Sequence, residues 1–425
     1  MSRFTGIIGI IILLGLAFLW SNNRKAINIR LVVSGLLLQL GLAVFILKVP
    51  VGQDIFAWLG KVINKLLDFS QEGALFVFGD LMKVSEILPP TIASAGVFLF
   101  TLIPTIIFVC VLVAMAYHVG LMQRVVAVLA RFMHWVMRVS GSEALSNVAS
   151  AFVGQVEAQI MIRPYLVGMT MSELLASMTG SMACIAGGVM AVYISMGVPA
   201  SYLLAASLMA APGALVISKI VFPETQESET KGVVKLEVKK EQTNIMDAIS
   251  HGASDGMAIS INVIAMLIGV IALVALVDAL LGYFGLFLGW TGLSLDFVGL
   301  DVNNLRLKDV FGAFFSLFAI VMGVPVAESF EVGSLMGTKM VINEFVAYSD
   351  LAPMIHAGAL SPKSIIIASF ALCGFANFSS IAIQLGGIGA MIPSRKADLA
   401  RLGFKAMICG TMASYISASL AGILM

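Results

Sequence analysis

A cluster of polar side chains interrupts an apolar stretch of the chain at Val153-Gly154-Gln155-Val156-Glu157-Ala158-Gln159. A charged carboxylate at membrane depth costs about 3 kcal/mol or more, so it normally faces protein or a water-filled cavity. Glycine at that depth favours non-helical backbone, which is tolerated only where protein or a cavity satisfies its polar groups. Residue types and spacing therefore indicate a site for a polar solute inside an apolar domain.

A second interruption follows in the other half of the chain, at Gly323-Val324-Pro325-Val326-Ala327-Glu328-Ser329. Two broken segments, one in each half and each with a carboxylate, are typical of the binding site of a secondary transporter. The polar groups in and near these segments are amides, hydroxyls and carboxylates without Lys or Arg: Gln155, Glu157, Gln159, Glu328, Glu331, Asn377, Ser379 and Ser380. Carboxylates accept paired hydroxyl donors, and amides match the edge of a heterocycle. A neutral, hydroxyl-rich molecule with a flat polar ring fits this set, and phosphorylated compounds do not.

Each of these residues also has a structural interpretation. Glu157 and Glu328 could pair with backbone amides, and Gln155 and Asn377 could cap broken helix ends. Ser380 could bond back to its own helix. The remaining polar residues are expected to be structural or to fix helix ends: Gln159, Ser379, Glu331, Asn343 and Glu344.

Composition places the chain in a membrane. It has 425 residues, of which 60% are hydrophobic and 12% charged, with a net charge of +1. Several stretches are long enough to cross a bilayer as helices, and no basic run suggests nucleic acid. Cysteines and histidines are scattered without metal-ligand spacing, so we expect neither metal nor cofactor. An enzyme would need a nucleophile or metal constellation that we do not find. A passive channel, the remaining alternative, would need a continuous polar lining.

The predicted fold is an all-α membrane protein with about eight transmembrane helices, interfacial amphipathic helices and two re-entrant helical hairpins in an inverted repeat. The predicted divisions are residues 1–140 (scaffold and interfacial helices), 141–221 (first hairpin and following helices), 222–246 (a solvated hydrophilic linker), 247–307 (a long scaffold helix and a polar connection), 308–393 (second hairpin and a helix broken at Asn377) and 394–425 (the last span).

Individual segments are assigned by apolar length and periodicity. Residues 4–20, 31–49, 92–122, 172–196, 201–221, 258–287, 365–392 and 404–424 are predicted to span. Residues 54–69 form an interfacial helix, and residues 144–166 form the first hairpin. The basic loop 21–30 indicates a cytoplasmic side. Arg124, Arg131 and Arg138 recur every seven residues along an amphipathic stretch that we expect to meet lipid head groups.

Several motifs together resemble the concentrative nucleoside transporter family, and the likeness extends over nearly the whole chain. The motifs are Gly154-Gln155-Val156-Glu157-Ala158, Ile162-Arg163-Pro164-Tyr165, Ile185-Ala186-Gly187-Gly188, the stretch 205–213, Asn343-Glu344-Phe345-Val346-Ala347-Tyr348 and the stretch 370–380. The resemblance implies a homotrimer in the bilayer of a bacterial inner membrane that imports nucleosides with protons or sodium, by an elevator-like movement of a substrate domain.

The resemblance also implies roles for individual residues. Gln155 and Glu157, beside Gly154 and Val156, match positions that meet the nucleobase. Glu328, Asn377 and Ser380 match positions that hold the ribose. Phe375 and Val189 match positions that line the pocket.

Three departures from the family pattern bear on the coupling ion. Val156 stands for a threonine, Ser150 for an asparagine and Cys184 for a serine. Sodium prefers oxygen ligands, as hard cations do, so only a weak sodium site is expected near Ser150, Val153, Cys184 and Ile185. A proton needs only a titratable acid, and the sequence favours proton coupling over sodium.

Overall fold

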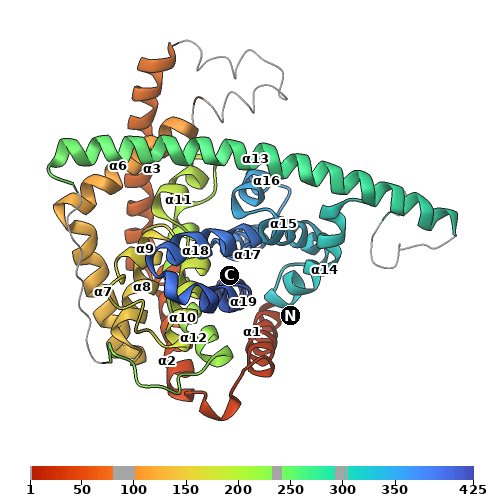
Figure 1. Cartoon of the computed structure of the whole chain (residues 1–425). Coiled ribbons are helices and arrows are strands. Elements are labelled where there is room, and N and C mark those ends of the chain that lie inside the picture. Colours follow the sequence, from red (N-terminus) through yellow and green to blue (C-terminus); the bar gives the residue numbers. More distant parts are fainter. Residues whose placement is uncertain (1, 80–99, 101, 232–241, 292–300, 302–304) are drawn as a thin grey trace.

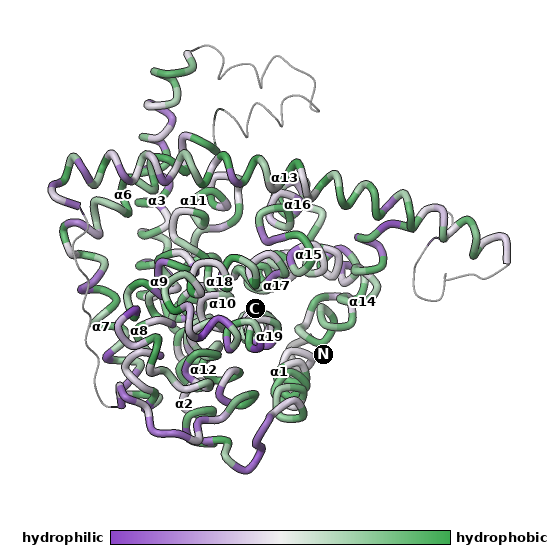
Figure 2. Tube along the Cα trace, viewed as in Figure 1, coloured by the Kyte–Doolittle hydropathy of each residue, from purple (hydrophilic) through white to green (hydrophobic). Residues whose placement is uncertain are grey.

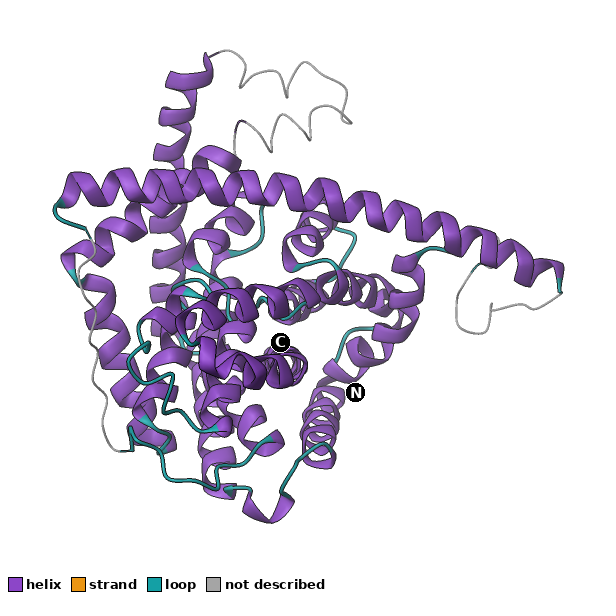
Figure 3. Ribbon diagram, viewed as in Figure 1, coloured by secondary structure: helices purple, strands orange, loops and turns teal. Residues whose placement is uncertain are grey.

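The computed structural model describes residues 2–79, 100, 102–231, 242–291, 301 and 305–425. Within these residues the chain is helical and contains no strand (Figure 3), which confirms the predicted all-α class. Most of the predicted polar connection 295–307, the start of the predicted span 92–122 and residues 232–241 of the linker lie outside the described residues.

The N-terminal helices are α1 (Ser2–Leu19), α2 (Ile29–Leu47) and α3 (Pro50–Phe78). The side chain of Asn28 caps α2 by accepting from the Leu31 backbone at 3.2 Å. Proline at the first position of α3 removes a donor that would have no helical partner. This helix is longer than the predicted 54–69 because no breaker occurs before Gly79, which has a φ of 54°.

A sharp bend separates α6 (Ile103–Val119) from α7 (Leu121–Met137), whose axes differ by 74°. Gly120 supplies the left-handed backbone between them, with a φ of 81°. One face of α7 is buried, through Val126, Ala130, Met133 and Met137. The opposite face leaves Phe132 and Trp135 exposed, as expected for an interfacial helix.

The first half continues with α8 (Gly141–Ser150), α9 (Glu157–Ile160), α10 (Met171–Ala183), α11 (Gly187–Ser195) and α12 (Ala200–Val221). Helices α8 and α10 each begin with a capping box, formed by Ser140 with Glu143 and by Thr170 with Glu173. Met171–Ser195 is together long and apolar enough to span, as predicted for 172–196, and the extended backbone at Cys184 divides this span into α10 and α11.

The longest helix, α13 (Ile245–Trp290), runs across the top of Figure 1 and packs against α6. It starts earlier than the predicted 258–287 because Asn244 caps it, accepting from the Asp247 backbone at 2.9 Å. Its start at Ile245 falls just inside the segment predicted as linker. Within the described residues, five helices are long and apolar enough to cross a membrane, or up to six if α6 and α7 form one bent span.

The second half contains α14 (Leu307–Met322), the short 3₁₀ turn η6 (Val326–Glu328), α15 (Ser329–Val341), α16 (Glu344–His356), α17 (Pro362–Leu372), α18 (Phe378–Met391), the 3₁₀ turn η7 (Pro393–Arg395) and α19 (Lys396–Leu424). Helices α14 and α15 pack side by side as a hairpin. They approach closely at Gly333, where a Cβ atom would lie 2.7 Å from the Gly312 carbonyl oxygen.

Helix α19 lies at the centre of the fold, where it contacts α1, α10, α12, α17 and α18 (Figure 1). Beside it, two broken helices meet at their breaks: the Phe375 backbone, between α17 and α18, donates to the Cys184 carbonyl, between α10 and α11, at 3.3 Å. Gly374, with a φ of 114°, allows this approach because any Cβ atom there would press on the Ala183 backbone. Figure 2 shows α13 largely hydrophobic and hydrophilic stretches along the lower edge.

Candidate functional site

A chain of hydrogen bonds crosses the fold where the broken helices meet. Gln155 Nε2 donates to Ser380 Oγ at 3.4 Å, and the Ser380 backbone donates to Asn377 Oδ1 at 2.9 Å. Asn377 Nδ2 donates to Glu344 Oε2 at 3.0 Å, and the Tyr193 hydroxyl donates to Glu344 Oε1 at 3.0 Å. Residues from both halves of the chain are thereby joined in one buried polar network.

Helix ends fix the polar groups of this network. Asn377 is the N-cap of α18, and Glu344 is the first residue of α16 after its own cap, Asn343. The amino ends of two helices therefore adjoin the Glu344 carboxylate, which their dipoles stabilise. Both side chains are buried, with Asn377 2% and Glu344 6% exposed. The capping role foreseen for Asn377 is confirmed, and its amide still reaches the acid.

The carboxylate that accepts from Asn377 is Glu344. Glu328 Oε2 accepts from the backbone and hydroxyl of Ser361, at 3.1 and 2.9 Å, near the start of α17. No hydrogen bond among the described residues joins Glu328 to Asn377 or Gln155. Asn343 fixes a helix end as expected, whereas the neighbouring Glu344 turns inward to the polar network.

Gln155 offers an unused acceptor. Its side chain is 8% exposed, and its Oε1 atom has no hydrogen-bond partner among the described residues. A buried polar atom left unpaired costs about 1–3 kcal/mol, so it indicates a place where water or a ligand donates. Gln155 precedes α9, and its neighbour Val156 packs against Gly387 of α18.

Glu157 faces another direction from the network. It is exposed, and its charge acts on Cys110 and Tyr117 of α6. Its carboxylate folds over Gly154, because a Cβ atom built on that glycine would collide with it. The contact is with the flexible end of an exposed side chain that can move aside, so it favours glycine at residue 154 without requiring it.

The predicted wall residues lie beside the network. Phe375 precedes Asn377 and is partly buried, and Val189 is partly buried on α11, one turn from Tyr193. Tyr193 itself is fully buried and stacks on Tyr348 with ring centroids 4.3 Å apart. Sequence reasoning missed Tyr193, since a tyrosine in an apolar helix has the pattern of an ordinary core residue.

Lys339 is a buried charge that sequence reasoning also missed. Its Nζ donates to the Ala371 carbonyl at 3.0 Å, in the last turn of α17, where the helix dipole favours a cation. Its charge also acts on Glu344. The site thus combines a buried carboxylate with a buried ammonium from the second hairpin.

The side chains near the predicted sodium site are already engaged. Ser150 Oγ donates to the Ser146 carbonyl at 2.7 Å and lies 3.0 Å from Ser181 Oγ. Cys184 Sγ contacts the Ser207 carbonyl at 3.7 Å. Sulfur is a poor ligand for a hard cation. Around Val153 and Ile185, mainly backbone carbonyls remain for an ion.

Gln159 completes this neighbouring network as a structural residue. Its Nε2 donates to Ser181 Oγ at 2.6 Å, and its Oε1 accepts from Ser177 Oγ at 2.6 Å. The structural role expected for Gln159 agrees with these bonds.

Profiles of known families match most of the chain. Residues 202–422 match the Na⁺ dependent nucleoside transporter C-terminus, residues 8–81 match its N-terminus, and residues 99–200 match a gate segment described as nucleoside recognition. The chain belongs to the Na⁺-dependent nucleoside transporter family.

Relatives of this nucleoside transporter occur in bacteria and mammals. It is 40% identical to an uncharacterized Bacillus subtilis transporter, YutK, over 100% of both chains. It is 34% identical to the nucleoside permease NupC of Helicobacter pylori, covering 99% of this chain and 98% of that protein. It is 37% identical to the rat sodium/nucleoside cotransporter 2, covering 99% of this chain and 62% of that protein. These relatives are transporters, not enzymes.

Solved structures of the transporter CNTnw share the fold. The inward-facing, substrate-bound state matches with a TM-score of 0.90 at 39% identity, covering 100% of this chain and 98% of that one. An outward-facing variant of CNTnw also matches with a TM-score of 0.90.

Proposed function

We propose that this transporter imports nucleosides across a bacterial inner membrane by symport, with the substrate held between the first hairpin and the break at Asn377. The observation that carries this proposal is the hydrogen-bond chain from Gln155 through Ser380 and Asn377 to Glu344, with one Gln155 oxygen unpaired among the described residues. An amide at one end suits a nucleobase edge, and a carboxylate with an amide at the other suits a sugar diol.

Individual roles follow from this placement. Gln155 meets the base, with Gly154 and Val156 shaping the approach and the exposed Glu157 beside it. Glu328 at the second hairpin tip holds the ribose together with Asn377 and Ser380, and Glu344 holds the Asn377 amide in position. Phe375 and Val189 form the apolar walls.

The organisation proposed for the chain extends the coarse fold. Residues 144–166 and the α14–α15 pair form two re-entrant hairpins, the protomer has about eight spanning helices, and three copies assemble. The family likeness supports these features, and the close packing of α14 on α15 fits the second hairpin.

Proton coupling is favoured over sodium coupling. The oxygen of Ser150 is engaged, Cys184 offers sulfur and Val156 offers no oxygen, so a sodium ion would rely on backbone carbonyls. Glu157 and Glu328 are the acids proposed to take up the proton. The alternative is sodium coupling at a site built mostly from backbone, which the family match supports.

Uptake into proteoliposomes tests both parts of the proposal. Uridine or adenosine should accumulate under an imposed pH gradient without sodium, and trans-stimulated exchange should distinguish a carrier from a passive channel. Accumulation driven only by a sodium gradient at uniform pH would reject proton coupling while leaving nucleoside transport intact. The triple change S150N, V156T and C184S, which adds oxygen ligands, should create sodium stimulation.

A further inference from the structure

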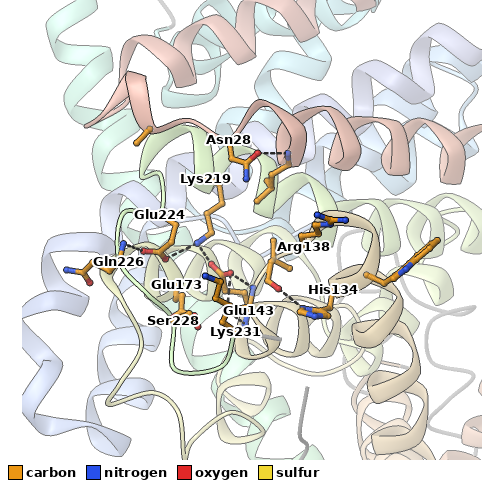
Figure 4. Close-up of a pocket in the computed structure, with 15 residues that line it drawn as sticks. Asn28, His134, Arg138, Glu143, Glu173, Lys219, Glu224, Gln226, Ser228 and Lys231 are labelled. Atoms are coloured by element: carbon orange, nitrogen blue, oxygen red, sulfur yellow. Dashed lines mark hydrogen bonds and ion pairs between the residues drawn. The ribbon is translucent and has the colours of Figure 1, made fainter. Parts of the chain in front are cut away.

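A polar cavity of about 630 Å³ is lined by residues none of which belongs to the proposed nucleoside site. Figure 4 shows this lining. The cavity lies among the first residues of α2, α8 and α10, the last residues of α7 and α12, and the described part of the linker. Its charged lining comprises Arg138, Glu143, Glu173, Lys219, Glu224 and Lys231. The linker is not simply solvated there: Thr230 is buried and its hydroxyl lies 2.9 Å from Ser142 Oγ.

Most of the inner charges are paired. Lys219 forms an ion pair with Glu143, donates to Ser172 Oγ at 2.9 Å and lies 3.4 Å from Glu224. These contacts satisfy the buried ammonium, as a buried charge requires.

Glu173 is different. One of its oxygens, Oε2, accepts from the Thr170 backbone at 2.9 Å in the capping box. The other, Oε1, is buried and has no partner among the described residues, although the residue is only 1% exposed. An unpaired carboxylate oxygen in such a place is costly unless a donor reaches it. The cavity therefore contains an acceptor fitted to an N–H donor that carries positive charge.

The rim of the cavity has the opposite charge. Arg138 is exposed and makes no side-chain hydrogen bond or ion pair with any described residue. Lys231 is mostly exposed and only 3.7 Å from Glu227. A guanidinium recognises phosphate through two parallel hydrogen bonds. Trp135, on the same end of α7, is 76% exposed, as tryptophans at a membrane surface are.

An apolar cavity adjoins this polar one along the chain. It has a volume of about 300 Å³ and is lined by Leu14, Gly15, Phe18, Ile27, Ile29, Val32 and Ile220. Ile27 and Ile29 alternate with Ala26 and Asn28 of the polar cavity, and Ile220 follows Lys219. Neighbouring residues in the chain, at 26–29 and at 219–220, thus line both the polar cavity and the apolar cavity.

We propose that the two cavities bind one aminophospholipid. Its primary ammonium donates to Glu173 Oε1, its phosphate is held by Arg138 with Lys231 at the rim, and part of an acyl chain occupies the apolar cavity. A choline headgroup has no N–H donor, and a glycerol headgroup has no cation. A serine headgroup has an ammonium but adds a carboxylate beside Glu143, Glu173 and Glu224, so ethanolamine is the headgroup that fits. This site is independent of nucleoside binding and of the coupling ion.

Native mass spectrometry and thermal unfolding of the purified full chain test the site. Short-chain phosphatidylethanolamine should be retained by the protein and should raise its unfolding midpoint. It should bind about tenfold more tightly than phosphatidylcholine or phosphatidylglycerol of equal chain length, which is the expected effect of one charge-assisted hydrogen bond. Equal binding of all three lipids would overturn the proposal. Equal binding of water-soluble glycerophosphoethanolamine would overturn the lipid assignment, because the apolar cavity would then contribute nothing.

Two variants locate the contacts. E173Q keeps the capping box, which accepts glutamine as well as glutamate, and should abolish the preference for ethanolamine over choline. R138N introduces a residue that tolerates the left-handed backbone seen at Arg138. It should weaken the binding of all three lipids by about tenfold. R131N, on α7 but outside the cavity, is the matched control and should leave binding unchanged. Unchanged binding by E173Q and R138N in folded protein would refute the site.

Discussion

Replacement of Glu344 by glutamine tests whether the buried polar network positions Asn377 for the substrate. The carboxylate accepts from Tyr193 and Asn377, one bond to each oxygen, both at 3.0 Å. Glutamine has only one acceptor oxygen, so one of these donors would face an NH₂ group. A hydrogen bond to a buried charge contributes about 1.5–3 kcal/mol, and about 1.4 kcal/mol corresponds to tenfold in an equilibrium constant.

The expected result for E344Q is therefore a rise of about ten- to a hundredfold in the half-saturating nucleoside concentration, because Asn377 loses the acceptor that holds its amide toward the ribose. The assay is equilibrium exchange of labelled uridine and adenosine in proteoliposomes, which needs no ion gradient and so does not depend on the coupling ion. Thermal unfolding of the variant checks that the protein is folded.

E328Q tests the carboxylate of the second hairpin tip in the same assay. Glu328 is only partly buried, and both of its bonds to Ser361 involve a single oxygen that glutamine can supply, so the variant should fold normally. Its half-saturating concentration should rise about tenfold, because the ribose loses a charged acceptor. A folded E344Q or E328Q protein that exchanges normally would refute the role given to that residue.

Three further changes test other parts of the fold. G154A should raise the half-saturating concentration by no more than about threefold, since a methyl group there displaces only the flexible, exposed end of Glu157; loss of exchange in folded protein would contradict this. Q155A should weaken binding about tenfold, measured by the same exchange assay, and an unchanged half-saturating concentration would remove the base-reading role. K219M should lower the free energy of unfolding by about 3–5 kcal/mol because it leaves buried Glu143 without its partner; restoration in K219M with E143Q would confirm the cause, and an unshifted denaturation midpoint would contradict it.

Helix breaks that contain polar residues could be predicted from the sequence, whereas the helix break at Cys184 could not. Gly154 and Asn377 each interrupt an apolar run with a glycine or amide, which at membrane depth indicates broken backbone that protein or a cavity satisfies. The break at Cys184 contains only apolar or small residues and no proline, so periodicity alone predicts a continuous helix. Its extended backbone depends on a tertiary contact, the hydrogen bond from Phe375.

Glu344 illustrates why side-chain direction limits prediction from sequence. An acidic residue directly after an asparagine cap is ordinary at a helix start, where the dipole stabilises it. Nothing in the local pattern shows that α16 turns this residue toward Tyr193 of the other half. Similarly, local composition predicts a solvated linker. The contact that buries Thr230 could not be read from that composition, because its partner, Ser142, lies 88 positions away.

The bond between the two broken helices has a mechanical consequence. Since the breaks at Cys184 and Phe375 are tied to each other, with Gly374 pressed against the Ala183 backbone, neither can bend without the other. Rotation must then be taken up at joints outside this pair. The left-handed residue Gly120, between α6 and α7, is such a joint, so stiffening it should slow turnover while leaving affinity intact.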